Sequence, residues 1–135
     1  MYQKVLVPIA LDHVDTLETV MALAKTLAGD NGEIIAMTVI EPISGYVAQY
    51  LPADQEEKSR QAVLASLDKA LAAYPDATRE VVVGHAGRRI VDFAEDNGCD
   101  CIIIASHQPG LQDYFLGSTA ARVVRHAHCA VHVIR

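Results

Sequence analysis

The sequence lacks any apolar stretch long enough to cross a membrane. Hydrophobic residues make up 51% of the 135-residue chain, but they fall into short runs, well below the roughly 18–20 residues of a membrane-spanning helix. The first run, residues 5–9, closely follows the N-terminus and is too short for a signal peptide. The sequence therefore predicts a cytoplasmic protein without membrane insertion.

Cysteines and basic residues are also scarce. The three cysteines, Cys99, Cys101 and Cys129, are an odd number without a disulfide framework, which indicates a reducing compartment. Cys99 and Cys101 do not form a C-x-x-C motif, and we interpret them as small apolar residues of the core. The net charge of −6 argues against nucleic-acid binding, because that function needs a basic face.

The motifs of metal sites and of common nucleotide sites are missing as well. His126 and His128 are two residues apart, a spacing that does not place both rings on one face of a helix, so we predict no metal site. The chain contains neither G-x-x-x-x-G-K-[ST] nor G-x-G-x-x-G. No internal repeat or linker divides it, and we expect one domain spanning residues 1–135.

The sequence does contain an alternation of buried strands and amphipathic helices. Short runs that are apolar on both faces predict strands at residues 5–9, 34–40, 79–83, 101–105 and 129–134. Apolar residues at three- and four-residue spacing predict helices between these runs, with an irregular excursion at residues 41–54. Such an order predicts a single three-layer α/β domain with a parallel sheet, because parallel strands need crossover connections.

Two of the predicted helices have specific boundaries and faces. One begins at about Asp54 and ends at Pro75, because proline cannot continue a helix. The last helix follows Gly117 and contains the apolar residues Ala120, Ala121, Val123 and Val124.

Ligands of such sheets bind outside the carboxyl ends of the strands. The loop after the strand predicted at residues 101–105 lies at that edge. It is polar and leads into a helix that begins at Gly117, Ser118 and Thr119. A helix N-terminus offers unpaired N–H groups and a partial positive charge, and glycine lets an anion approach them, so this segment is suited to phosphate. The alternative is that Ser118 only caps the helix and Gly117 only turns the chain.

Five segments spread over the chain carry a family resemblance. They are VLVPI at residues 5–9, SH at 106–107, LGSTA at 116–120, VVRHA at 123–127 and AVHVI at 130–134. Together they resemble the universal stress protein family, and the match is most specific in the C-terminal third. The resemblance implies a five-stranded parallel sheet in the order 3-2-1-4-5, of the Rossmann-like type shared with adenine nucleotide alpha hydrolases.

The resemblance also implies which residues touch an adenine nucleotide. Pro8, Ile9 and Ala10 would flank the ribose and adenine, and the backbone of Val39 would hold the adenine edge. The phosphates would be wrapped by the loop after the fourth strand and by the following helix start: Ala105, Ser106, His107, Gln108, Gly110, Gly117, Ser118 and Thr119.

Three positions depart from the ATP-binding branch of the family. That branch reads glycine, two residues, glycine, nine residues, glycine, then serine or threonine. Here Ala105 stands for the first glycine and Gln108 approximately for the second, and the loop is one residue shorter. Ala10 stands where the family usually has an aspartate. The resulting Ala-Ser-His-x-Pro pattern resembles a subgroup of short chains whose members include nucleotide binders.

The function expected from the resemblance is that of a nucleotide-sensing regulatory module in stress response. The ligand would be ATP, AMP or ADP, with Mg²⁺ as a companion of the phosphates, and the regulated partner would be another protein. No general base or metal-holding carboxylate is identifiable, so we expect no enzyme activity and no catalytic residue. The resemblance also implies a homodimer through the last strand, residues 129–134, with residues 41–54 as a second contact in tetramers. The alternative function is a dimeric interaction module that has lost nucleotide binding.

Overall fold

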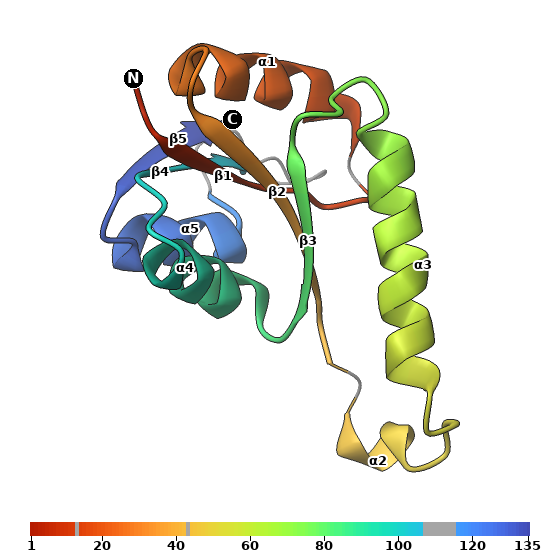
Figure 1. The fold of residues 1–135 in the computed structure, drawn as a ribbon. Coiled ribbons are helices and arrows are strands. Elements are labelled where there is room, and N and C mark those ends of the chain that lie inside the picture. Colours follow the sequence, from red (N-terminus) through yellow and green to blue (C-terminus); the bar gives the residue numbers. More distant parts are fainter. Residues whose placement is uncertain (13, 43, 107–115) are drawn as a thin grey trace.

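The computed structural model describes residues 1–12, 14–42, 44–106 and 116–135, which form a parallel sheet between two layers of helices (Figure 1). The elements are β1 (Lys4–Pro8), the 3-10 turn η1 (Val14–Thr16), α1 (Leu17–Ala28), β2 (Glu33–Ile40), α2 (Gly45–Ala48), α3 (Gln55–Ala70), β3 (Thr78–Val83), α4 (Ala86–Asp96), β4 (Cys101–Ala105), α5 (Ser118–His126) and β5 (Ala130–Ile134). The strand order is β3-β2-β1-β4-β5, and all four neighbouring pairs are parallel. The predicted fold class and strand order are therefore confirmed.

Each face of the sheet is covered by its own pair of helices. On one face, Val5 and Val7 of β1 belong to a cluster with buried residues of α1 and α3. On the other face, Leu6 belongs to a cluster with Ile90 of α4 and Val123 of α5. Successive residues of a strand point to opposite faces, and this explains why the strands are apolar at nearly every position.

Two cysteines belong to these clusters as small apolar residues. Cys101 packs on the α1 and α3 side and Cys99 on the α4 and α5 side. Burial raises the pKa of both thiols to about 11. Cys99 is 7% exposed and Cys101 is 1% exposed, which confirms the interpretation of the pair as core residues.

The predicted end of α3 at Pro75 is wrong, because the helix ends at Ala70. Arg79 of β3 accounts for the earlier end. Its guanidinium donates to the carbonyl oxygens of Leu71 (2.9 Å), Tyr74 (3.1 Å) and Ala77. The last carbonyls of a helix have no partner within the helix. Here the guanidinium of Arg79, from the following strand, donates hydrogen bonds to backbone carbonyls of the segment that follows α3.

The two valines of α5 differ in burial, since Val123 is fully buried and Val124 is 45% exposed. Gly87 of α4 lies against Arg122, so α4 packs on the side of α5 that carries Arg122. Val124 projects from the opposite side of α5. In the part of the chain that the structure describes, α5 packs mainly against α4 and β5.

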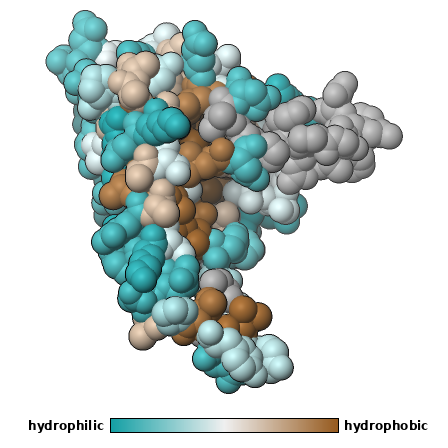
Figure 2. All heavy atoms as spheres, turned by 90° about the vertical axis from the view of Figure 1, so that its right-hand side faces the viewer, coloured by the Kyte–Doolittle hydropathy of each residue, from teal (hydrophilic) through white to brown (hydrophobic). Residues whose placement is uncertain are grey.

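The excursion at residues 41–54 is not wholly irregular, because it contains the one-turn helix α2. Ser44 begins this helix by accepting a hydrogen bond from the backbone N–H of Val47 (3.3 Å). α2 projects beyond the end of the sheet (Figure 1). Tyr46 and Tyr50 are both more than 70% exposed, and Figure 2 shows apolar atoms at the surface of the same projection.

Within the described ranges, no helix is both long and apolar enough to span a bilayer.

Candidate functional site

A cavity of about 360 Å³ lies at the carboxyl ends of β1, β2 and β4. Its wall includes residues of these strands, of the turns that follow them, and of the first turns of α1, α4 and α5: Pro8, Ile9, Ala10, Asp12, Asp15, Thr16, Leu17, Val20, Met37, Val39, Ala86, Ile90, Ile104, Ala105, Ser106, Gly117, Thr119 and Ala120. The position agrees with the rule that open parallel sheets bind ligands outside the carboxyl ends of their strands. Its volume lies at the lower end of the roughly 300–1,000 Å³ of small-molecule sites.

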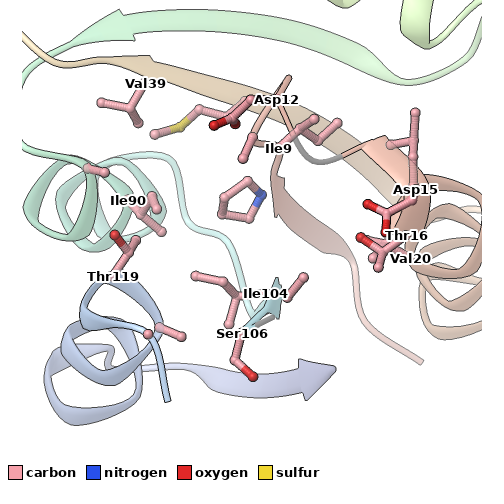
Figure 3. Close-up of a pocket in the computed structure, with 18 residues that line it drawn as sticks. Ile9, Asp12, Asp15, Thr16, Val20, Val39, Ile90, Ile104, Ser106 and Thr119 are labelled. Carbon is pink, nitrogen blue, oxygen red and sulfur yellow. The ribbon is translucent and has the colours of Figure 1, made fainter. Parts of the chain in front are cut away.

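The floor of the cavity is apolar and buried. Met37 and Ile104 come from β2 and β4, and Val20 and Ile90 come from α1 and α4. Figure 3 shows Ile9, Val39 and Ile90 around the same space. A flat heteroaromatic ring would find matching dispersion contacts on such a surface.

The rim of the cavity is polar. Asp12 and Asp15 lie on the exposed turn between β1 and α1, and Thr16 follows them. Figure 3 shows Asp15 beside Thr16, with Thr119 and Ser106 across the cavity. The described lining residues include no Lys, Arg or His. The charged side chains of this lining are therefore carboxylates.

Backbone hydrogen bonds fix the wall between β1 and β2. The N–H of Ile9 donates to the carbonyl oxygen of Met37 (2.8 Å), and the hydroxyl of Thr38 donates to the carbonyl oxygen of Ile9 (3.1 Å). These two bonds hold the turn after β1 against the end of β2, which places Ile9 and Ala10 at the cavity.

Ser106 closes the wall at the end of β4. Its N–H donates to the carbonyl oxygen of Ile134 (2.8 Å), and its hydroxyl makes a longer contact of 3.4 Å with the same oxygen. The hydroxyl is thus engaged with β5, and the side chain is 6% exposed. Ser106 consequently shapes the cavity wall and anchors the edge strand.

The start of α5 supplies unpaired backbone donors. Gly117 is the residue before the helix, it is buried, and it lines the cavity with Thr119 and Ala120. No side chain caps this helix start among the described residues. The first N–H groups of a helix have no partner within it, so this end of the cavity is suited to an anion.

The structure brings together eight of the predicted binding residues. These line the cavity: Pro8, Ile9, Ala10, Val39, Ala105, Ser106, Gly117 and Thr119. Ser118 begins α5, is exposed and is not among the lining residues. His107, Gln108 and Gly110 lie outside the described residues.

Several lining residues were not predicted from the sequence. Asp15 and Thr16 come from the turn after β1, and Ala86 comes from the turn after β3. Both turns follow strands of the predicted sheet, and this placement in the sequence could have identified their residues as candidates for the site. The sequence does not distinguish the residues of the apolar floor from core residues, because Val20, Met37 and Ile90 follow the same apolar pattern as the core.

The described residues contain no group of three His, Cys, Asp or Glu side chains placed to hold a metal ion. Asp12 and Asp15 line the cavity from the same turn. Mg²⁺ is usually bound by one or two carboxylates together with substrate phosphates and water. A cation at this rim would therefore depend on the phosphates of a ligand.

Comparison with known proteins identifies the family. The model of the universal stress protein family matches residues 1–135. The chain is 25% identical to universal stress protein G of Escherichia coli O157:H7, with all of both chains covered. Among solved structures it resembles the hypothetical protein MJ0577, with 26% identity, 99% and 96% of the two chains covered, and a TM-score of 0.79.

Two further structures share the fold and were solved with nucleotides. One is a universal stress protein in complex with cAMP, with 24% identity, 99% and 97% coverage and a TM-score of 0.63. The other is a universal stress protein from Archaeoglobus fulgidus in complex with dAMP, with 20% identity, 99% and 98% coverage and a TM-score of 0.58. The match of the family model over residues 1–135, together with the strand order and the cavity, shows that this chain belongs to the universal stress protein family.

Proposed function

We propose that this chain binds an adenine nucleotide in the cavity at the carboxyl end of the sheet and serves as a non-catalytic regulatory module. The observation that carries the proposal is the pairing of a buried apolar floor with an uncapped helix start in one cavity. The apolar surface around Met37 and Val39 suits adenine, and the N–H groups after Gly117 suit a phosphate. The nucleotide-bound relatives support the same chemistry.

The proposed ligands are ATP, ADP and AMP, with Mg²⁺ as a companion of the longer phosphate chains. Absence of catalysis is part of the proposal. Hydrolysis would need a group that activates water near the terminal phosphate. The described lining contains no histidine or lysine, and its two carboxylates, Asp12 and Asp15, lie on the turn after β1 and not at the start of α5, where we place the phosphate. We expect phosphate release from ATP to stay at background.

The direct test is calorimetry with ATP, ADP and AMP on refolded, nucleotide-free protein. Ala10 offers a blocking variant, because it is exposed and lies at the cavity. Ala10→Trp should fill the mouth, preserve the fold and weaken binding at least about tenfold, which corresponds to about 1.4 kcal/mol. Ala53→Trp, at an exposed position outside the lining, is the matched control. No heat with any nucleotide, and no thermal stabilisation, would exclude the proposal.

Self-association is a second proposed function, and β5 is the observation that favours it. β5 is an edge strand, paired only to β4 among the described strands. The carbonyl of Ile134 points toward β4, where it accepts from Ser106. Peptide groups of alternate residues point to opposite edges, so those of Val131 and Val133 face outward and could pair with a second copy.

Native mass spectrometry tests this association. Val133→Pro removes one outward N–H and should shift a dimer to monomer while circular dichroism stays unchanged. A dimer that holds no nucleotide, even with added ATP, would favour the pure interaction module instead. We also propose the projection with Tyr46 and Tyr50 as the contact that extends dimers to tetramers; their rings lie 5.8 Å apart in an edge-to-face arrangement.

A further inference from the structure

Three arginine side chains surround the first turn of α4. Arg88 and Arg89 belong to this turn, and Arg122 reaches it from α5, which lies beside α4 (Figure 1). Arg88 and Arg122 are exposed, and Arg89 is partly buried. The start of a helix carries a partial positive charge, which disfavours cations. The stability of α4 therefore does not account for three arginines at this position.

Two glycines make room for two of these arginines. A Cβ added to Gly87 would lie 2.7 Å from Cδ of Arg122, and one added to Gly84 would lie 2.6 Å from Cγ of Arg89. Both distances are far below the roughly 3.5–4.0 Å at which carbon atoms make contact. The stems of both arginines are thus seated directly against the backbone at the start of α4.

No carboxylate neutralises the three guanidinium groups within the described part of the chain. None of its ion pairs includes Arg88, Arg89 or Arg122. Nε of Arg89 is buried without a hydrogen-bond acceptor among the described residues, which is costly for a charged donor. The carboxylate of Glu41 does meet this turn, but it accepts from the backbone N–H of Ala86, at 3.0 Å. The turn is therefore suited to an anion from outside the chain.

We propose that the first turn of α4 is a docking site for an acidic segment of a partner protein. The proposal goes beyond nucleotide binding and does not depend on it. The planar donors of a guanidinium match the two oxygens of a carboxylate. Gly87, against which Arg122 lies, and Arg89 are about 200° apart around the helix axis, with Arg88 between them. One small anion cannot reach across this arc, whereas an extended segment with several carboxylates can.

The first test is fluorescence anisotropy with a labelled hexaglutamate peptide at about 50 mM salt. Binding should be saturable and should weaken several-fold at about 0.5 M salt, because salt screens the attraction between charges. A Gly-Ser peptide of the same length should not bind.

A pair of double variants locates the site. Arg88→Gln with Arg122→Gln removes two exposed charges and should weaken peptide binding at least tenfold while circular dichroism stays unchanged. Arg60→Gln with Lys69→Gln removes the same charge from α3, which covers the other face of the sheet, and should change binding less than twofold.

The outcomes separate this inference from the proposed function. Absence of peptide binding at low salt, or equal weakening by the two double variants, would overturn the inference. A single-stranded RNA hexamer that binds the same turn more tightly than the peptide would also overturn it, in favour of nucleic acid. Nucleotide binding is a separate measurement, because neither Arg88 nor Arg122 lines the cavity. Calorimetry with AMP should therefore give the same affinity for the Arg88 and Arg122 double variant as for the wild type.

Discussion

The hydroxyl of Thr38 donates a hydrogen bond of 3.1 Å to the carbonyl oxygen of Ile9 inside the protein. Thr38 is 8% exposed and belongs to β2, whereas Ile9 belongs to the turn that leaves β1. The bond therefore joins the ends of two strands where they line the cavity.

Thr38→Val should destabilise the protein by about 1–2 kcal/mol, because it removes the donor that faces a buried carbonyl. The urea midpoint of unfolding measures the loss. Thr26→Val is the matched control, since the hydroxyl of Thr26 is exposed and bonds only to the carbonyl of Ala22 within α1. The control should change stability by less than about 0.5 kcal/mol; equal losses in the two variants would contradict the assigned role.

Gly84→Ala should destabilise the protein by about 1–3 kcal/mol, because Gly84 has a φ of +149° that side chains rarely adopt. An added Cβ would also lie 2.6 Å from Cγ of Arg89. Gly45→Ala is the control, since nothing lies within 4 Å of its added Cβ and its φ is not positive. Thermal unfolding should show a lower midpoint for Gly84→Ala alone. A midpoint that stays at the wild-type value would show that the turn into α4 relaxes without cost.

Arg79→Lys should cost about 2–3 kcal/mol despite the conserved charge. The guanidinium of Arg79 donates to three backbone carbonyls and lies 3.0 Å from the carboxylate of Asp68. A single ammonium group cannot replace this planar fork. Arg125→Lys, at an exposed position of α5, should be nearly neutral in the same denaturation experiment. If both variants unfold at the same urea concentration, Arg79 does not stabilise the end of α3.

Asp100 should make stability depend on acid pH. Its carboxylate accepts hydrogen bonds from the backbone N–H groups of Gln3 and Lys4, each at 2.9 Å. Burial by itself would raise the pKa of Asp100, but these two bonds favour the ionised form, and the pKa lies below its ordinary value of 3.8. The stabilisation is therefore complete above about pH 4 and is lost as the pH falls through the lowered pKa.

Asp100→Asn measures this contribution. The variant should be less stable than the wild type by about 1–2 kcal/mol at pH 7, and the difference should shrink below about pH 4. Asp30→Asn, at an exposed position, should show no such trend. A difference that is the same at pH 7 and pH 3 would mean that the ionised carboxylate is not the stabilising form.

The sequence determined the layered fold because its information is local. Strands such as β1 are apolar on both faces, and helices such as α5 are apolar on one, so their order predicts a covered parallel sheet. The strand order 3-2-1-4-5 was implied by the family resemblance and is confirmed by the structure. The same reasoning nominated the carboxyl edge as the site, and residues from three predicted turns line the cavity there.

The tertiary structure decided what the cavity offers to a ligand. The bond from Ala86 to Glu41 joins residues 45 positions apart, and the bond from Ser106 to Ile134 joins residues 28 positions apart. Neither pairing has a sequence motif, because each depends on where the ends of separate strands and helices meet. Whether a helix end is free for phosphate, or already holds a carboxylate of the chain, is set by that meeting of elements. The sequence by itself therefore determined at which edge of the sheet the cavity lies, and only the fold decided which helix starts and side chains border it.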